Sequence, residues 1–364
     1  MASSGGCSDQ KRIIGLIAGA AVAGLAYNYL SKDAPTEVNS NNVTPSLITT
    51  SKTSKEEASD VTPTFERIDG NATRKVILEE LTIAVAELKE SHDIVPGLAV
   101  VIVGERSDSK AYVRMKKIAA KKIGLFTIDS DLPVTISEAD LIEHVQSLNN
   151  NPKVHGILVQ LPLPDHINTS LVLKTISAEK DADGFHPLNV GHMCLSGGEP
   201  PLAIACTPLG CLELLLRYNV DIQGKTCVVL GRSNIVGMPM VSLLQSKNGT
   251  VTCCHSKTKN MKEIVRTAEI LVVAIGRKEM VRGDWIKPGA VVIDVGMHQI
   301  EDKTKKSGFS YVGDVNFKEV SPKCSKITPV PGGVGPMTIA MLMKNTINLA
   351  RHSVNLKPLP PYQP

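Results

Sequence analysis

The chain has 364 residues, enough for about two ordinary domains, and its 42% apolar and 21% charged residues are typical of a soluble globular enzyme. The net charge of +4 is small for this length, and no basic run is interleaved with aromatic residues, so a nucleic-acid partner is not expected. The eight cysteines lack paired CxxC spacing, which argues against a disulfide framework or a metal site and favours a reducing compartment.

The N-terminus is set apart by an uncharged, 18-residue stretch at residues 13–30, preceded by Lys11 and Arg12. Crossing a bilayer takes roughly 17–25 residues, so this stretch is borderline, and its Gly and Ala content makes it only mildly apolar. A membrane anchor and an organelle-targeting segment, for a mitochondrion or plastid, fit about equally; a cytosolic protein with a disordered tail is the third reading. Residues 31–63 are rich in Ser, Thr, Asn, Asp and Glu, which predicts a solvated linker.

From residue 65 onward, apolar runs alternate with stretches of helical period. Near-continuous β-branched runs between helices indicate parallel sheets in α/β units. The expected strands are residues 98–103, 156–161, 226–230, 250–254, 270–274 and 290–294, and the clearest expected helices are residues 72–91, 137–149 and 339–349. We therefore expect an α/β protein of two domains, with residues 206–211 as the hinge between them.

The helix expected after the first strand carries a lysine on its apolar face. Helical spacing aligns Lys116 with Tyr112, Met115, Ala119 and Ile123. A lysine in such a stripe more often extends its ammonium to solvent than lies in a site. If it is buried, desolvation lowers its pKa and suits it to general acid/base chemistry near neutral pH. Tyr112, one turn earlier on the same face, is placed to stack on an aromatic substrate.

Two further polar elements follow at positions where α/β proteins bind ligands. Gln160 comes near the end of the apolar run at residues 156–161 and just before a proline-rich stretch, so it is either an edge residue or a donor in a site. The segment 180–185 holds Asp181 and Asp183 in a turn. This pair is either an Asx turn closed by glycine or part of a ligand site, and it has too few ligands for a metal.

Residues 223–239 read as a strand, a tight glycine turn and a helix, which is typical of a phosphate site at a helix N-terminus. As a GxGxxG fingerprint the stretch is imperfect, because Ser233 replaces the second glycine and Gly237 comes one place late. The next strand ends without the acidic residue that holds the ribose of NAD. Arg232 and Ser256 are instead placed to hold a 2′-phosphate, which favours NADP over NAD.

Residues 328–338, Thr-Pro-Val-Pro-Gly-Gly-Val-Gly-Pro-Met-Thr, lead into the last helical pattern. Proline fixes φ and glycine permits close backbone approach, so this segment predicts a rigid loop suited to lying against a flat ligand. The alternative is an ordinary connector at the start of a helix.

Taken in order, these stretches resemble the bifunctional methylenetetrahydrofolate dehydrogenase/cyclohydrolase (FolD) family. The resemblance spans about residues 65–351 and rests on five motifs. They are SxxYVxxK at residues 109–116, VQLPLP at 159–164, KDxDG at 180–184, GRSxxVGxP at 231–239 and PGGVGP at 331–336. In the family the first motif belongs to the longer pattern VGxxxxSxxYVxxKxK, and this chain departs from it in one place, since Ile118 stands where a second lysine is usual.

The resemblance implies two activities in one cleft: oxidation of 5,10-methylenetetrahydrofolate with NADP⁺, and hydrolysis of the 5,10-methenyl product to 10-formyltetrahydrofolate. It implies a homodimer, and catalytic or activating roles for Lys116, Gln160, Asp183 and Ser109, with Asp183 holding the pterin ring. It implies folate contacts from Tyr112, Val159, Leu161, Pro331, Gly332, Gly333, Val334, Gly335 and Pro336. It implies cofactor contacts from Gly231, Arg232, Ser233, Ile235, His255, Ser256, Gly276 and Met297.

The resemblance also divides the chain. Residues 65–206 are expected to form the folate-binding catalytic domain, completed by a C-terminal helix at 337–352. Residues 207–336 are expected to form a Rossmann-like NADP-binding domain, with the active-site cleft between the two. Residues 1–64 lie outside both.

Two other readings remain at this point. One is a shikimate-dehydrogenase-like oxidoreductase, which shares the two-domain plan and a catalytic lysine; the segment 331–336 speaks against it. The other is a membrane-tethered folate- or nucleotide-binding protein without turnover, against which the intact set of Lys116, Gln160 and Asp183 argues.

Overall fold

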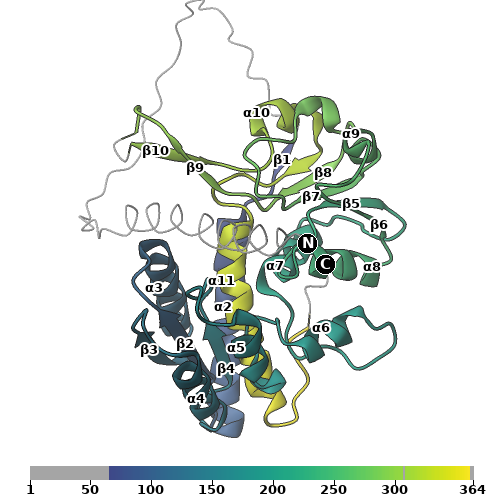
Figure 1. The fold of residues 1–364 in the computed structure, drawn as a ribbon. Coiled ribbons are helices and arrows are strands. Elements are labelled where there is room, and N and C mark those ends of the chain that lie inside the picture. Colours follow the sequence, from purple (N-terminus) through teal and green to yellow (C-terminus); the bar gives the residue numbers. More distant parts are fainter. Residues whose placement is uncertain (1–64, 306–307, 361–364) are drawn as a thin grey trace, which may run out of the picture.

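Two parallel sheets organise residues 65–305 and 308–360, the part of the chain that this computed structural model describes, apart from the side chains of residues 107–109 and 111. The smaller sheet has three strands in the order β3–β2–β4, and the larger has six in the order β1–β11–β8–β7–β5–β6. In Figure 1 the sheets lie in separate lobes, the smaller below and the larger above. The predicted two-domain α/β fold is confirmed.

The smaller sheet consists of β2 (Gly97–Val103), β3 (Phe126–Leu132) and β4 (Gly156–Val159). All of β2 and β4 is buried, as their apolar runs predict, and β4 ends two residues before the expected strand. Helix α3 (Ser107–Lys122) packs on β2 and β3. The lobe also contains α4 (Glu138–Asn149) and α5 (Thr169–Thr175), and the next helix, α6 (Pro187–Cys194), contacts the helix at residues 237–246 of the other lobe.

The larger sheet is formed by β5 (Thr226–Leu230), β6 (Thr250–Cys254), β7 (Ile270–Val273), β8 (Val291–Asp294), β11 (Lys326–Ile327) and β1 (Glu66–Arg67). Its helices are α7 (Cys206–Arg217), α8 (Gly237–Ser246), α9 (Met261–Val265) and α10 (Phe317–Val320). A separate antiparallel ribbon of β9 (His298–Glu301) and β10 (Phe309–Val312) extends from this lobe (Figure 1). Strand β1 pairs with β11, so the first described strand joins the larger sheet before the chain enters the smaller lobe.

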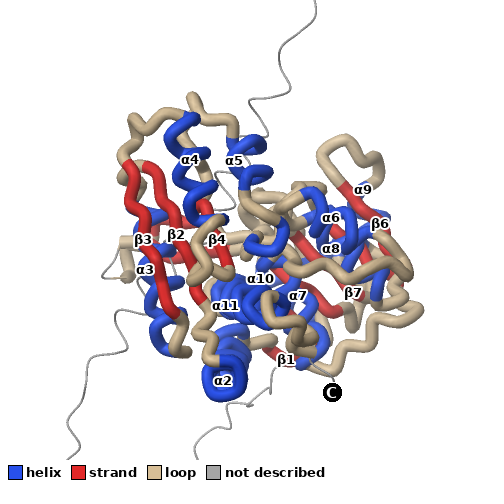
Figure 2. The backbone as a smooth tube through the Cα atoms, turned by 90° about the horizontal axis from the view of Figure 1, so that it is seen from below, coloured by secondary structure: helices blue, strands red, loops and turns tan. Residues whose placement is uncertain are grey.

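Two long helices, α2 (Gly70–His92) and α11 (Val334–His352), pack against each other and against α7. Figure 2 shows these three helices from below, between the two sheets. The N-terminus of α2 is capped by the Asp69 carboxylate, which accepts hydrogen bonds from two backbone N–H groups of the first turn. Helix α11 begins five residues before the expected helix at 339–349, so the last part of the predicted loop at 328–338 is helical.

A buried ion-pair cluster fixes α7 against α11. The Glu213 carboxylate, 2% exposed, lies 2.9 Å from Arg217 Nε and 3.7 Å from Lys344 Nζ. A buried carboxylate needs such partners because an unpaired charge is costly to desolvate. The helices between the lobes are therefore held by charge as well as by apolar packing.

No helix within residues 65–305 and 308–360 is long and apolar enough to cross a membrane. The anchor or targeting segment predicted at residues 13–30 lies outside the described residues, as does the predicted linker at 31–63.

Candidate active site

A cavity of about 110 Å³ lies between the lobes, beyond the carboxyl ends of β4 and β8. Its walls come from α3, the start of α7, the loop before α8 and the start of α11. Carboxyl ends of parallel strands are where open α/β sheets bind ligands. The lining residues are Tyr112, Lys116, Leu158, Val159, Gln160, Leu161, Asp183, Phe185, Cys206, Thr207, Ile235, Val236, Val295, Val334, Gly335 and Thr338.

Lys116 is buried in the wall of this cavity, with only 4% of its surface exposed. Its Nζ donates a hydrogen bond to Gln160 Oε1 at 3.2 Å and lies 4.3 Å from the centre of the Tyr112 ring. Burial lowers the pKa of Lys116, and the nearby Asp183 carboxylate partly opposes that shift. The predicted apolar face of α3 is confirmed, but the expectation that Lys116 extends to solvent is wrong, because this face of α3 packs in the core.

Gln160 is held in one orientation by its own neighbour. Its Nε2 donates to the carbonyl oxygen of Leu161 at 2.8 Å, which leaves Oε1 facing the Lys116 ammonium. The side chain is buried beyond the end of β4. Gln160 therefore lines the cavity, with its amide oxygen directed at Lys116.

The two aspartates of the 180–185 turn do different things. Asp181 accepts hydrogen bonds from the backbone N–H groups of Phe185 and His186 and from Asn189 Nδ2, so it is the residue that closes the turn. Asp183 lines the cavity instead. Burial raises the pKa of Asp183 to about 6, with Lys116 opposing the rise and Asp181 adding to it. A carboxylate here is thus ionised only above mildly acidic pH.

Several lining residues were missed by the sequence reasoning. Cys206 and Thr207 open α7, and the Thr207 hydroxyl lies 3.1 Å from that of Thr338 on α11. The Cys206 thiol lies 3.6 Å from Asn345 Nδ2, and burial raises its pKa. The only sequence signal for these residues was their place in the predicted hinge at 206–211. Phe185, Leu158 and Val295 carried no signal beyond their apolar character, and Val236 carried only its place in the motif at 231–239.

The Pro/Gly segment supplies part of the wall and part of its support. Val334 and Gly335 line the cavity. Gly332 has φ +101°, and its carbonyl accepts a hydrogen bond from the Gly70 N–H at 2.9 Å, which joins the segment to the start of α2. A Cβ on Gly333 would lie 2.6 Å from the Pro329 carbonyl oxygen, so only glycine fits there. Half-buried Pro331 precedes this pair, and Pro336 is buried in the first turn of α11.

Ser109 lies in α3, but its side chain belongs to those that the structure does not describe. Its predicted role therefore rests on its place in the motif alone.

The imperfect fingerprint folds as the tight turn that a phosphate site needs. Gly231 follows β5 with φ +115°, and a Cβ on it would lie 2.1 Å from the Ala274 carbonyl oxygen. A Cβ on Gly237 would lie 2.2 Å from the Gly231 carbonyl oxygen. The Ser233 hydroxyl accepts from the N–H groups of Val236 and Gly237, so it caps the start of α8 where a second glycine is usual.

The two residues expected to recognise a 2′-phosphate lie on neighbouring strand ends. Leu230 of β5 is paired in register with Cys254 of β6, and Arg232 and Ser256 each follow two residues later. Both side chains are exposed and free to meet a ligand. His255 lies between Cys254 and Ser256, and its Nδ1 accepts from a backbone N–H two residues on.

The remaining predicted cofactor residues surround the same strand ends. Ile235 lines the main cavity. Gly276 and Met297 line a small adjoining hollow together with Ala274, Val295, Gly296, His298 and Asp314. The residues predicted to bind cofactor and substrate thus lie around two adjoining hollows at one edge of the larger sheet.

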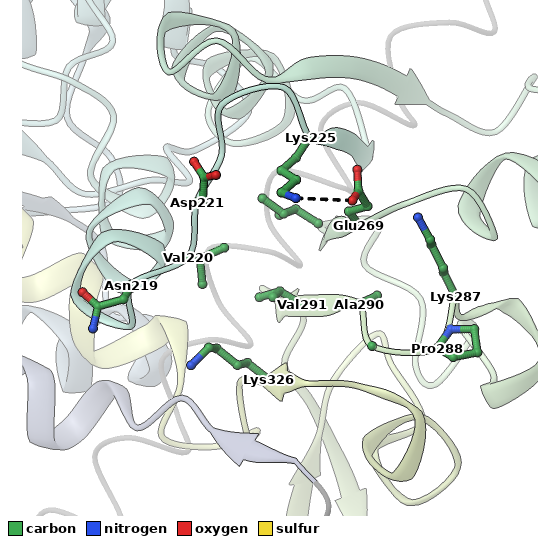
Figure 3. A pocket seen from close by; sticks show the side chains of 12 residues that line it. Asn219, Val220, Asp221, Lys225, Glu269, Lys287, Pro288, Ala290, Val291 and Lys326 are labelled. Atoms are coloured by element: carbon green, nitrogen blue, oxygen red, sulfur yellow. Dashed lines mark ion pairs between the residues drawn. The ribbon is translucent and has the colours of Figure 1, made fainter.

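A larger hollow of about 300 Å³ lies at the opposite edge of that sheet (Figure 3). Residues that precede β5, β7 and β8 line it, so it faces the amino ends of the strands. Figure 3 shows Lys225 pointing toward Glu269, with the Nζ 3.6 Å from Oε1. Lys326 pairs with Glu66. Two lysines of this hollow already have acidic partners, and open α/β sheets bind ligands at the carboxyl ends of their strands, not at the amino ends. The cavity between the lobes is therefore the candidate site.

Comparison with known proteins agrees with this geometry. Residues 68–183 match the catalytic domain of tetrahydrofolate dehydrogenase/cyclohydrolase, and residues 205–354 match its NAD(P)-binding domain. The chain belongs to this family. Lys116, Gln160 and Asp183 of the cavity lie in the region that matches the catalytic domain. The lining residues from Cys206 onward lie in the region that matches the NAD(P)-binding domain. The resemblance to the tetrahydrofolate dehydrogenase/cyclohydrolase family predicted from five motifs is confirmed.

Similar proteins of the family come from plants, bacteria and protozoa. The chain is 54% identical to bifunctional protein FolD 2 of Arabidopsis thaliana over 288 residues, which cover 79% of this chain and 96% of that protein. It is 52% identical to the chloroplastic FolD 4 of the same plant over 290 residues, 80% of each chain. The structure of the Trypanosoma brucei FolD dehydrogenase-cyclohydrolase, solved with NADP and an inhibitor, matches with a TM-score of 0.76 at 43% identity, covering 80% of this chain and 99% of that one.

Proposed function

We propose that this protein oxidises 5,10-methylenetetrahydrofolate with NADP⁺ and hydrolyses the resulting 5,10-methenyl compound to 10-formyltetrahydrofolate. The observation that carries the proposal is the buried Lys116–Gln160 pair, facing Asp183 in a cavity at the carboxyl ends of strands from both lobes. In this cavity Lys116, which is suited to general acid/base chemistry, lies next to the NAD(P)-binding domain. The family membership and the match to FolD proteins over most of their length support the same pair of activities.

For substrate binding, we assign the pterin ring to Asp183 and the face of Tyr112. An ionised carboxylate accepts two parallel N–H bonds from an amino-pyrimidinone edge. The Tyr112 ring lies beside Lys116 in the same wall, where it can stack on the folate. The backbone of Val159 and Leu161 and the segment 331–336 complete this half of the site.

Hydride transfer uses no protein acid or base. A hydride leaves the methylene carbon for the nicotinamide ring, and the substrate nitrogens stabilise the cation that forms. The protein contributes the relative position of the two ligands. Correct orientation of two reactants lowers the activation free energy by up to about 7–11 kcal/mol. In this fold, the strand ends that carry Ile235, Gly276 and Met297 perform that positioning.

Hydrolysis uses Lys116. Because burial lowers its pKa, a larger fraction of the side chain is a neutral amine near neutral pH than for an exposed lysine. The amine accepts a proton as water adds to the methenyl carbon, and it returns that proton to N5 as the carbon–N5 bond breaks. The second proton of the water goes to solvent, and the formyl group stays on N10. Gln160 holds Nζ in place, and Ser109 is proposed to assist.

NADP⁺ is the nucleotide, and we assign its 2′-phosphate to Arg232 and Ser256. A guanidinium forms paired, charge-assisted bonds to phosphate oxygens. Gly231, Ser233 and the start of α8 are proposed to face the pyrophosphate, with His255 at the adenosine side. The presence of NADP in the similar Trypanosoma brucei structure supports the choice of cofactor.

For the assembly and compartment, we propose a homodimer and an organelle-targeting role for residues 1–64. Relatives of 52% and 49% identity are chloroplastic and mitochondrial proteins. Light scattering tests the dimer, which would have about twice the 39.0 kDa of one chain. A fluorescent fusion of residues 1–64 tests the compartment, and carbonate extraction separates a lumenal protein from one that residues 13–30 anchor in a membrane.

The first experiment is a spectroscopic assay of the purified protein with 5,10-methylenetetrahydrofolate, comparing NADP⁺ with NAD⁺. We expect NADPH formation, followed by 10-formyltetrahydrofolate. Turnover with NAD⁺ alone would keep the reaction and overturn the roles of Arg232 and Ser256. No turnover with either nucleotide would favour a binding protein without catalytic activity.

A further inference from the structure

Asp314, between β10 and α10, is a fully buried carboxylate that holds the backbone of the loop at residues 275–276. Its Oδ2 accepts hydrogen bonds from the N–H groups of Ile275 at 2.8 Å and Gly276 at 2.9 Å. These two residues follow β7, and Gly276 lines the small hollow that adjoins the main cavity. Asp314 thus determines where this loop lies at the strand ends.

The other oxygen of Asp314 is held from the ribbon. His298, the first residue of β9, places its Nε2 2.7 Å from Asp314 Oδ1. The imidazole is 14% exposed and lines the same hollow. Both oxygens of Asp314 therefore have partners, one from the loop and one from the ribbon.

A second buried carboxylate, Asp294 at the end of β8, carries the network toward the substrate side. It accepts from the N–H groups of Gly296 at 2.9 Å, Asp314 at 3.0 Å and Val315 at 2.9 Å. Its own N–H donates to the hydroxyl of Thr328 at 2.7 Å. Thr328 begins the Pro/Gly segment 328–338.

The packing around the two carboxylates leaves no space for a side chain at the neighbouring glycines. A Cβ on Gly313 would lie 1.8 Å from Asp294 Oδ2, and a Cβ on Gly296 would lie 2.4 Å from the Asp314 Cγ. Burial and the neighbouring Asp314 raise the pKa of Asp294. Two neighbouring buried carboxylates cost stability that apolar packing would not, so their presence at the strand ends indicates a role in arranging the site.

We infer that Asp314 is a positioning residue for hydride transfer: with His298 and Asp294 it fixes the 275–276 and 296–297 loops against the nicotinamide nucleotide and ties them to the segment that borders the folate. This inference deepens the proposed function and rests on it. A loop displaced by an ångström would misalign the donor and acceptor carbons without removing either ligand.

The test is Asp314→Asn in the full-length protein. Asparagine has nearly the same shape but only one acceptor oxygen, so it cannot serve both the loop amides and His298 as the carboxylate does. Glu301→Gln is the matched control, because it neutralises an exposed carboxylate on the ribbon that carries His298. Four quantities are measured: the hydride-transfer rate with NADP⁺, cyclohydrolase activity on the 5,10-methenyl compound without nucleotide, NADPH affinity by fluorescence, and the melting temperature.

For Asp314→Asn we expect hydride transfer to fall about 10- to 100-fold and NADPH affinity about tenfold, a loss of about 1.4 kcal/mol per tenfold step. Cyclohydrolase activity should stay within about twofold of the wild type, because Lys116 and Gln160 lie in the other lobe. Equal losses of both activities would mean a merely structural role and would overturn the inference. Unchanged hydride transfer would overturn it as well.

His298 gives an independent test if Asp314→Asn does not fold. His298→Ala should lower hydride transfer selectively, and His298→Gln should restore most of it, because the glutamine amide can donate to Asp314 Oδ1. Failure of the glutamine variant to exceed the alanine variant would count against the network. If the wild type catalysed no hydride transfer, the proposed function would fail, and unchanged NADPH affinity in both Asp314→Asn and His298→Ala would overturn the inference separately.

Discussion

Replacing Lys116 by methionine tests the hydrolytic half of the site most directly. Methionine is unbranched and close in volume to the lysine stem, so it should fill the same space beside Tyr112. Since Lys116 is only 4% exposed and its burial already opposes the charged form, the variant should keep its melting temperature or raise it. The change therefore removes the amine and leaves the packing of this wall in place.

The expected loss follows from the role of the amine. Positioned general acid/base groups contribute about 10²- to 10⁴-fold to rate. At about 1.36 kcal/mol per tenfold step, this is about 2.7–5.4 kcal/mol of the barrier. Cyclohydrolase turnover in Lys116→Met should fall by this factor, while folate still binds. Decay of the 5,10-methenyl absorbance without nucleotide measures it, and retention within about threefold of wild type would remove Lys116 from the mechanism.

The same variant has a second, distinguishable effect through Asp183. The Lys116 ammonium holds the pKa of Asp183 down against the effect of burial, which otherwise raises it. In Lys116→Met the Asp183 pKa should rise further above about 6. Weaker folate binding at pH 7 that recovers at pH 8 would show this coupling, and a KM independent of pH in the variant would contradict it.

Three further predictions concern the nucleotide, the pH dependence and the glycine turn. Arg232→Ala should raise the KM for NADP⁺ about 10- to 150-fold, because it removes a charged hydrogen bond that contributes about 1.5–3 kcal/mol. Any turnover with NAD⁺ should stay unchanged. Equal effects on both nucleotides would refute the 2′-phosphate contact. Because the pKa of Asp183 is raised to about 6, folate affinity should be constant above that pH and fall below it, whereas Asp183→Asn should bind weakly at every pH. Gly237→Ala should abolish NADPH fluorescence enhancement, since its Cβ would lie 2.2 Å from a backbone oxygen, while Gly191→Ala, with nothing within 4 Å, should bind normally.

Elements that bury a continuous apolar run were predicted well. The expected strand at 226–230 has the bounds of β5, and the expected strands at 250–254 and 270–274 match β6 and β7 to within a residue. Strands β5 and β7 lie inside the parallel sheet, where nearly every side chain is buried and apolar, whereas β6 is an edge strand whose residues are mostly exposed or half-buried. Strand β3 and the β9–β10 ribbon were missed because most of their side chains are exposed or half-buried, so no apolar run reveals them.

The site was less predictable, because its chemistry depends on partners that are distant in sequence. The apolar face of α3 was evident, but whether Lys116 reached solvent depended on Gln160, 44 residues later, and on packing against α11. Likewise the sequence showed two aspartates in one turn without showing that Asp181 closes it and Asp183 faces the cavity. Asp314 gave no signal at all, since its role comes from contacts with residues 38 and 39 positions earlier.

Each of the two proposed reactions depends on residues of a different lobe, which explains how one cavity can serve both. In the proposed mechanism, hydride transfer depends on the nucleotide loops of the larger sheet, and hydrolysis depends on Lys116 and Gln160 of the smaller lobe. The 5,10-methenyl product of the first step has its reactive carbon where the substrate carbon was, so the pterin contact that we propose for Asp183 would serve both steps without a change of position. A variant that loosens only the nucleotide loops should therefore release no more 5,10-methenyl compound per turnover than the wild type, whereas Lys116→Met should let it accumulate in solution.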